Sequence, residues 1–336
     1  MTMVLRMAAL ALALAVPSGL AAEDFIADAY AVSVQNDVTY AQGKVGASGA
    51  SPQLRDLKLD VYRPTLAGKP LGGRPAVVLA YGGAFHRGSK GTTRFEEDGA
   101  SDSAMGDWCQ TLAAAGYVCL SIEYRLVPDD PALPDAIDPA GLVPKAMLKD
   151  PVATARIDVI RRRMGLPLLD DQSREQLWNT LFAAAQDMSN AVGYARSHAR
   201  DLGIDPDRIA VGGFSAGGAT AVNLAYGMGV PVQAVLSLSG GVAGYDLRKT
   251  AKAGMPPGLF VMGQNDLEGV QLGTRALLGA LGAAGIKSET AWMPGFGHFY
   301  PMGAPSLGSD MTRMTLKTRA LRFLDRTLGG SKPAKP

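Results

Sequence analysis

Short apolar runs alternate with longer helical patterns along most of the chain, and this alternation narrows the possible folds more than any other feature. The apolar runs predict β-strands at 57–62, 76–80, 118–124, 209–211, 234–238, 259–262 and 289–293. The patterns between them predict helices at 105–115, 181–202, 216–226, 272–284 and 311–328. Strands that alternate with helices form parallel sheets covered by helices. We therefore expect an α/β fold with a mostly parallel, doubly wound sheet.

The composition fits one folded domain and gives no sign of a nucleic-acid partner. Of the 336 residues, 47% are hydrophobic and 19% are charged, which is enough apolar material for a sizeable core. The net charge is +2, and the most basic run, the arginines at 161–163, has the pattern of a solvated helix face. We expect one domain at 23–328, followed by a disordered tail at 329–336.

The first 22 residues resemble a secretory signal peptide. Arg6 is their only charged side chain, residues 7–16 are apolar, and small residues precede a cleavage point at Ala21 or Ala22. The alternative is an uncleaved membrane anchor, although the apolar stretch is shorter than the ~20 residues of a spanning helix. We therefore expect a secreted or periplasmic protein without stable membrane insertion after cleavage.

Ser215 lies in a pattern typical of a nucleophilic serine. Gly213, Ser215 and Gly217 form G-x-S-x-G between the strand predicted at 209–211 and the helix predicted at 216–226. Such a strand-turn-helix corner needs small residues around the serine, and it exposes the hydroxyl at a helix N-terminus, where backbone N–H groups favour negative charge. The alternative is a plain glycine-rich turn, because the chain has 41 glycines.

A serine hydroxyl needs a base to remove its proton, and the chain has 3 histidines. His298 follows the last predicted strand, so it would lie at the same sheet edge as Ser215. His86, near a glycine loop, is the second candidate, whereas His198 lies in a polar helical stretch typical of a surface. We predict that His298 is the base. Its alternative role is that of a loop histidine packed on the aromatic side chains beside it.

A carboxylate at a third strand end would orient the imidazole and stabilise its cation. Asp266 follows the strand predicted at 259–262, and Glu268 is a less favoured substitute two residues further on. The chain order Ser215, Asp266, His298 matches the order of one particular scaffold. An Asx turn or a helix cap is the alternative role for Asp266.

With these residues in place, the chain resembles the α/β-hydrolase superfamily, and within it the esterase and lipase group that includes hormone-sensitive-lipase-like carboxylesterases. The resemblance also covers "LKLDVYRP" at 57–64, "YGGAFHRGSK" at 81–90, "GYVCLSIEYRLVP" at 116–128 and "LGIDPDRIAVGGFSAGG" at 202–218. It implies a hydrolase of small-molecule or lipid-like carboxylic esters with an acyl-serine intermediate, no cofactor and no metal ion. The alternatives are a serine peptidase or amidase, and a scaffold that binds without catalysis.

The resemblance further implies an oxyanion hole made by the backbone N–H groups of Gly83, Ala84 and Ala216. Such donors must already point to the carbonyl oxygen that becomes negative. Two positions depart from the family's pattern, because Tyr81 stands for the usual histidine and Ala84 for the third glycine. The methyl group of Ala84 would penalise a positive φ.

The segment at 129–180 has no counterpart in the family that we can place. It is inserted between the strand predicted at 118–124 and the helix that precedes Ser215, so we expect it to form a lid over the carboxyl ends of the strands. Phe85, Phe214 and Phe299 are predicted to be apolar walls of the substrate pocket. The alternatives are a stabilising excursion of the chain and aromatic side chains that belong to the core.

Cys109 and Cys119 lie on either side of a helix-turn-strand corner predicted at Gly116. Each lies about 10 Å from the turn, given ~1.5 Å per helical residue and ~3.3 Å per strand residue, so the two are level. We predict a disulfide between them. The alternative is a pair of buried free thiols.

Arg125 would emerge at the end of a buried strand, where an unpaired guanidinium is costly. Asp187, in the helix that leads towards Ser215, is the predicted partner. The pair would have a structural role. An ordinary solvated arginine is the alternative.

Overall fold

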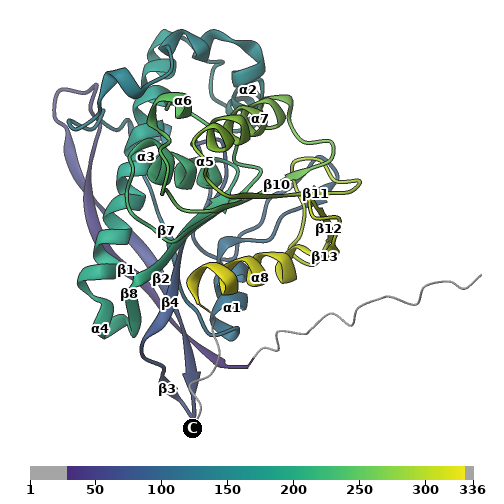
Figure 1. The fold of residues 1–336 in the computed structure, drawn as a ribbon. Coiled ribbons are helices and arrows are strands. Elements are labelled where there is room, and N and C mark those ends of the chain that lie inside the picture. The colour runs from purple at the N-terminus through teal and green to yellow at the C-terminus, as the bar shows by residue number, and fades with distance from the viewer. Residues whose placement is uncertain (1–28, 330–336) are drawn as a thin grey trace, which may run out of the picture.

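The structure is a computed structural model, and it describes residues 29–329. The predicted signal peptide at 1–22 and residues 330–336 of the predicted tail lie outside the described residues. The main sheet has the strand order β1-β2-β7-β4-β8-β9-β10-β11-β12-β13, with β3 also paired to β2. Figure 1 shows this sheet as a twisted layer with helices on both faces.

The centre of the sheet is parallel and its two edges are antiparallel. The parallel strands are β7 (Val118–Ile122), β4 (Arg74–Ala80), β8 (Ile204–Phe214), β9 (Ala234–Leu238), β10 (Gly258–Gly263) and β11 (Ser288–Met293). The antiparallel strands are β1 (Ala31–Val45), β2 (Gln53–Leu66), β3 (Lys69–Pro70), β12 (Pro305–Gly308) and β13 (Arg313–Thr315). The predicted α/β fold class with a mostly parallel sheet is confirmed.

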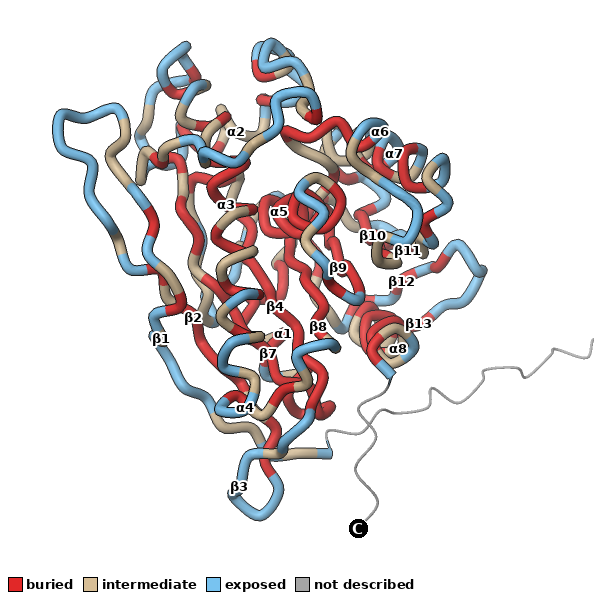
Figure 2. Tube along the Cα trace, turned by 60° about the vertical axis from the view of Figure 1, so that its left-hand side comes forward, coloured by how far each residue is buried: buried red, intermediate tan, exposed pale blue. Residues whose placement is uncertain are grey.

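The core lies along the parallel strands because their sequences are apolar on both faces. Every residue of β4, β9 and β10 is buried, as expected for strands with helices on either side. Figure 2 shows this as a continuous buried centre, with β1 largely exposed at the edge.

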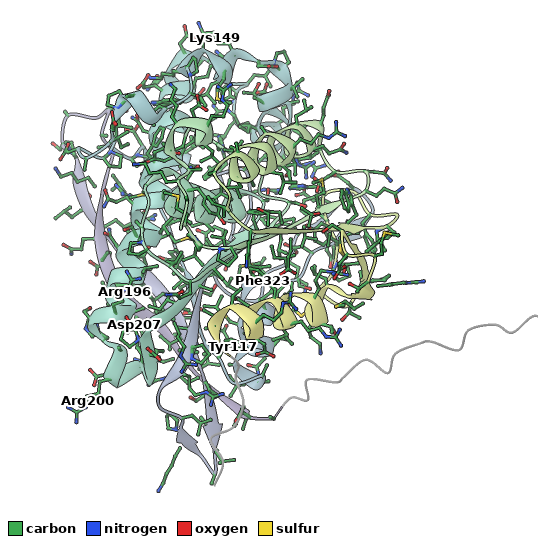
Figure 3. The ribbon with its side chains drawn as sticks, viewed as in Figure 1. Tyr117, Lys149, Arg196, Arg200, Asp207 and Phe323 are labelled. Atoms are coloured by element: carbon green, nitrogen blue, oxygen red, sulfur yellow. A yellow bond between two sulfur atoms is a disulfide. The ribbon has the colours of Figure 1, made fainter. Side chains whose placement is uncertain are left out.

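The helices divide between the two faces of the sheet. Helices α1 (Met105–Ala114) and α8 (Leu316–Leu328) cover one face, and α3 (Asp171–Ser197), α5 (Ala216–Val222) and α7 (Glu268–Ala283) cover the other. Tyr117 and Phe323, which Figure 3 labels, are fully buried beneath α8, where the Tyr117 hydroxyl donates to Asp325. Within residues 29–329, no helix is both long and apolar enough to cross a membrane.

The predicted insertion at 129–180 consists of short helical turns and two helices. It contains the end of η1 (Val127–Asp129), then η2 (Pro139–Gly141), η3 (Lys145–Lys149), α2 (Pro151–Arg163) and the beginning of α3. Figure 3 labels Lys149 at the outer end of this segment. Helix α3 continues unbroken past residue 180, so one helix belongs to both the insertion and the core.

The sequence patterns missed the edges of the sheet. Strand β1 has 15 residues, but only Tyr40 and Gly43 are buried, and its sequence has no continuous apolar run that would predict a strand. The last helix begins at Leu316 and not at 311. The residues before it form a turn, where Met311 has a φ of 63°, and then β13. Its start is fixed by the Thr315 side chain, which accepts a hydrogen bond from a backbone N–H of the first turn.

Two predicted links are confirmed. Cys109 and Cys119 form a disulfide with a Cα–Cα distance of 5.0 Å, which joins α1 to β7. The Arg125 guanidinium lies 2.8 Å from Oδ1 of the buried Asp187, and the same carboxylate accepts the Arg125 backbone N–H at 2.8 Å. This pair holds α3 against the carboxyl end of β7, which is the side of the sheet where the predicted site residues gather.

Candidate active site

Ser215 lies on a sharp corner between β8 and α5. Its backbone has φ 52° and ψ −117°, a strained conformation for a residue with a side chain. A Cβ at Gly213 would lie 2.3 Å from the Ala80 carbonyl oxygen, and a Cβ at Gly217 would lie 2.0 Å from the same atom. Only glycine fits at these two positions, so the G-x-S-x-G spacing is a packing requirement of the corner.

Ser215, His298 and Asp266 form a hydrogen-bonded chain. His298 Nε2 lies 2.9 Å from Ser215 Oγ, and His298 Nδ1 lies 2.7 Å from Asp266 Oδ1. The three residues come from the ends of different strands, as the sequence predicted. His298 and Asp266 are about 5% exposed. The geometry allows the imidazole to accept a proton from Ser215 while the carboxylate holds its other nitrogen.

Asp266 is fixed by partners that the sequence analysis did not find. Oδ2 accepts hydrogen bonds from Ser239 Oγ at 2.5 Å and from the Gly263 N–H at 3.0 Å, and Oδ1 accepts the Leu267 N–H at 2.8 Å. Together with His298, these donors surround the carboxylate and fix its orientation towards the imidazole. The signal that could have found Ser239 is its place at the carboxyl end of β9, next to β8 in the sheet.

The Tyr300 hydroxyl group forms a hydrogen bond with the Ser239 hydroxyl group. Tyr300 Oη lies 2.7 Å from Ser239 Oγ. Burial, with a contribution from the nearby Asp266 charge, raises the pKa of the Tyr300 hydroxyl well above its ordinary value. Because Ser239 gives its own proton to Asp266, the tyrosine is the donor in this contact. The Tyr300 hydroxyl therefore donates to Ser239, and the Ser239 hydroxyl donates to the Asp266 carboxylate.

The predicted oxyanion loop lies beside Ser215. Gly83 has a φ of 123° and Ala84 a φ of 55°, so Ala84 does adopt the conformation that its methyl group disfavours. Within residues 29–329, the N–H groups of Gly83, Ala84 and Ala216 donate to no protein acceptor, and Gly83 and Ala84 line the same cavity as Ser215. Three free donors at this place suit a carbonyl oxygen that becomes negative.

His86 holds this loop and is not placed as the base for Ser215. Its Nδ1 lies 2.7 Å from the Ala84 carbonyl oxygen, and its Nε2 lies 3.2 Å from Nη1 of Arg161 in α2. Burial, with the Arg161 charge adding to it, lowers the pKa of the His86 imidazole, although the Ala84 contact opposes the change. The neutral ring therefore donates to Ala84 and accepts from Arg161. His198 is exposed at the C-terminal cap of α3, with Nδ1 3.0 Å from the Tyr194 carbonyl oxygen.

The arginines at 161–163 are not a uniform solvated face. Arg161 is only 7% exposed, and besides contacting His86 it donates through Nε to the Pro167 carbonyl oxygen at 2.6 Å. Arg163 forms ion pairs with carboxylates outside α2, whereas Arg162 points to solvent. Arg161 is buried because it contacts the loop at 81–86, and the charge pattern of the sequence does not show this contact.

The cavity at Ser215 is narrow. Its free volume is about 20 Å³. The residues that line it are Gly83, Ala84, Arg87, Phe95, Arg156, Ile160, Phe214, Ser215, His298 and Phe299. Phe214 and Phe299 thus lie where the sequence predicted, but Phe85 is not part of the wall. Its ring packs edge-on against Tyr124 in the core, because the positive φ of Phe85 itself turns the side chain away.

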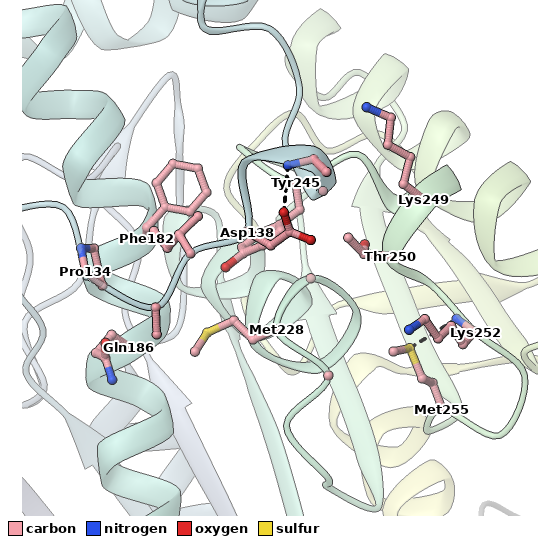
Figure 4. Close-up of a pocket in the computed structure, with 16 residues that line it drawn as sticks. Pro134, Asp138, Phe182, Gln186, Met228, Tyr245, Lys249, Thr250, Lys252 and Met255 are labelled. Atoms are coloured by element: carbon pink, nitrogen blue, oxygen red, sulfur yellow. Dashed lines mark hydrogen bonds between the residues drawn. The ribbon is translucent and has the colours of Figure 1, made fainter.

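A second cavity of about 430 Å³ lies elsewhere and contains none of these residues. Figure 4 shows it between the loop at 134–141, α3 and the segment that follows α6 (Leu247–Thr250). Phe182 and Tyr245 form part of its apolar wall, and Lys249 and Lys252 lie at its rim.

Comparisons with known proteins found a family model and solved structures that resemble this chain. The family model named BD-FAE matches residues 174–233, a segment that contains Ser215. Among solved structures, Thermogutta terrifontis esterase 2 phosphorylated by paraoxon is similar to this chain at 20% identity, with a TM-score of 0.51 over 88% of this chain and 94% of that one. The propionate-bound form of that esterase has 19% identity and a TM-score of 0.52 over 92% and 97%. No curated protein matches the chain.

These likenesses identify the fold. The chain has the α/β-hydrolase fold that its motifs predicted, and the two solved structures named above are of an esterase.

Proposed function

We propose that the protein is a serine carboxylesterase. The observation that carries this proposal is the chain of hydrogen bonds from Asp266 through His298 to Ser215, at 2.7 and 2.9 Å, in a cavity that also contains the Gly83 and Ala84 N–H groups. A nucleophile, its base, an orienting carboxylate and free donors are the parts that acyl transfer requires.

The proposed reaction has two halves. Ser215 Oγ attacks the ester carbonyl carbon as His298 Nε2 takes the hydroxyl proton, and His298 then gives that proton to the leaving alcohol. In the second half, water attacks the acyl-serine as His298 Nε2 takes its proton, and His298 then returns that proton to Ser215 Oγ as the acid is released. Asp266 stabilises the imidazolium in both halves.

The negative oxygen of each tetrahedral intermediate would accept hydrogen bonds from Gly83, Ala84 and Ala216. Each donor of this kind contributes roughly 3 kcal/mol to transition-state stabilisation in comparable enzymes. The strain at Ala84 and Ser215 is compatible with this role, because backbone strain concentrates where groups must point in one direction.

The insertion at 129–180 is proposed to be a lid. Arg156 and Ile160 of α2 line the cavity together with Ser215. A free volume of about 20 Å³ holds roughly one water molecule, and we propose that movement of α2 makes room for an acyl chain. The substrate in this proposal is a small-molecule or lipid-like ester.

The test is a substrate panel with the purified mature chain. Short and long p-nitrophenyl esters are compared with p-nitroanilides of the same acyl groups, and Ser215→Ala is the control. We expect the esters to turn over and Ser215→Ala to lose at least ~10³-fold in kcat. Faster cleavage of the anilides would favour a peptidase or amidase. A folded protein that cleaves neither would favour a binding scaffold.

We also propose that the protein is exported to the periplasm or the medium. Support comes from the signal-like sequence at 1–22 and from the Cys109–Cys119 disulfide, a bond typical of oxidising compartments. N-terminal sequencing of the expressed protein tests this proposal. A mature chain that begins near residue 22 supports export, and an intact N-terminus in the cytoplasmic fraction contradicts it.

A further inference from the structure

A cluster of charges lies next to the Ser215 cavity. Glu97 pairs with Arg87, Arg156 and Arg163, and Asp98 pairs with Arg156 at 2.9 Å and with Arg163 at 3.4 Å. Arg87 follows the oxyanion loop, Arg156 and Arg163 belong to α2, and Glu97 lies on the hairpin of β5 (Glu96–Glu97) and β6 (Ala100–Ser101). We call these five residues the ion-pair cluster. It contains one more positive than negative charge.

Two arginines of the ion-pair cluster line the cavity itself. The Arg87 guanidinium lies over the Phe95 ring at 5.0 Å, and the Arg156 guanidinium lies over the Phe299 ring at 5.3 Å. Stacking on an aromatic face fixes the plane of each guanidinium and restricts its motion. The wall next to Ser215 is therefore not apolar throughout, and it presents two oriented cations.

Arg87 also has an unused donor. Its Nε is buried and has no hydrogen-bond partner among residues 29–329. A buried N–H group without an acceptor is costly, and in native structures it often indicates an absent partner such as a water, an ion or a ligand. The extra positive charge of the ion-pair cluster and this free donor both suit an anionic ligand.

The ion pairs that must break when the cavity opens favour a negatively charged substrate. In the proposed lid motion α2 separates from the hairpin, which breaks the contacts of Arg156 and Arg163 with Glu97 and Asp98. A neutral substrate then leaves Arg156 without a carboxylate partner, whereas Glu97 keeps its ion pair with Arg87. A carboxylate on the substrate can take the place of Glu97 and accept the same guanidinium hydrogen bonds.

From these observations we propose that the preferred substrates are esters that carry a carboxylate close to the scissile bond, bound by Arg87 and Arg156. The inference rests on the proposed esterase function and names its substrate class. Arg87 and Arg156 are the specificity-determining residues, and Glu97 competes with the substrate for them.

The test compares matched charged and neutral esters. Monoethyl glutarate against diethyl glutarate places the carboxylate on the acyl side, and acetoxyacetate against methyl acetoxyacetate places it on the alcohol side. We expect kcat/KM to be roughly tenfold higher for the charged member of at least one pair, equivalent to about 1.4 kcal/mol. This preference should shrink at high salt, because screening weakens the attraction.

Variants identify the groups responsible. Arg87→Met and Arg156→Met should each bring the ratio of charged to neutral kcat/KM close to one, and Glu97→Gln should increase it. Arg162→Met is the matched control, since Arg162 lies on the same helix, is exposed and forms no ion pair among residues 29–329. It should leave the ratio unchanged.

The inference is overturned if the wild-type enzyme hydrolyses neutral esters but shows no preference for the charged members. It is also overturned if a preference persists in both folded arginine variants, as judged by circular dichroism. Failure of the proposed function looks different, because neither the charged nor the neutral esters would then be hydrolysed.

Discussion

Nη1 of Arg161 lies 3.2 Å from Nε2 of His86, and this contact joins the insertion helix α2 to the loop that carries Gly83 and Ala84. Through its other nitrogen, His86 donates to the Ala84 carbonyl oxygen at 2.7 Å. The insertion therefore does more than cover the cavity. It helps to fix a loop whose residue Ala84 has a φ of 55° and would not hold this conformation unaided.

Arg161→Met should lower kcat by roughly tenfold with little change in KM, because donors aimed at the oxyanion act mainly on the transition state. The control is Arg162→Met, on the exposed side of the same helix. The decisive readout is the affinity for a boronic acid that mimics the tetrahedral intermediate. We expect it to fall in parallel with kcat/KM. If the variant lost the same factor in affinity for the boronic acid and for the product acid, Arg161 would only stabilise the fold.

Ser239→Ala removes the 2.5 Å hydrogen bond to Asp266 Oδ2 and leaves the Tyr300 hydroxyl facing a methyl group. Two backbone N–H groups still hold the carboxylate. We therefore expect a moderate loss in kcat of about 3- to 30-fold, well short of the ~10³-fold expected for Ser215→Ala. Steady-state kinetics with a p-nitrophenyl ester measures it, and unchanged kcat would mean that the Ser239 hydroxyl does not position Asp266.

Asp102 makes stability depend on pH. Burial raises the pKa of its carboxyl to about 6, while the Phe95 N–H, which donates to it at 2.8 Å, opposes the shift. A raised pKa means that the folded state holds the proton more tightly than the unfolded chain. Stability from this group is thus present below about pH 4 and is lost as the pH rises through about 6.

Asp102→Asn keeps an acceptor for Phe95 and removes the buried charge. It should raise the free energy of unfolding by about 1 to 3 kcal/mol at about pH 7.5 and have little effect near pH 4. Urea unfolding at both pH values measures the difference. A variant that is destabilised at the higher pH would contradict this account of Asp102.

The Cys109–Cys119 bond closes a short loop, with a sequence separation of 10 residues. In the chain-entropy model, such a loop contributes a little under about 3 kcal/mol to the free energy of unfolding. The double variant Cys109→Ala, Cys119→Ala should lose that amount and become insensitive to reductant, whereas reduction should destabilise the wild type. Two free thiols in the denatured, unreduced wild type would show that the bond is absent.

The parallel strands and the hydrogen-bonded residues Ser215, His298 and Asp266 could be predicted because they depend on local signals in the sequence. Apolar runs mark buried strands, and the carboxyl ends of parallel strands meet at one edge, so residues that follow those strands must gather there. Strand β1 was missed because it is an edge strand in which only 2 of 15 residues, Tyr40 and Gly43, are buried.

Arg87, Arg156 and Arg161 could not be predicted for a different reason. Each is a long polar side chain whose position depends on how the insertion packs over the oxyanion loop. The periodicity of apolar residues, which predicts helices and strands, contains no information on that packing. In sequence, a charged residue that reaches into a site looks the same as one that points to solvent. Phe85 was misplaced because the turn at Ala84 and Phe85 sends its ring into the core.

The central claim is that Ser215 is the nucleophile, and covalent labelling tests it most directly. The wild-type protein is treated with paraoxon, digested and analysed by mass spectrometry, with Ser215→Ala as the control. We predict one diethylphosphoryl group, on the peptide that contains Ser215, with loss of esterase activity in step with labelling and no label on the folded control. Labelling of another residue, or unlabelled wild-type protein that still hydrolyses esters, would contradict the account.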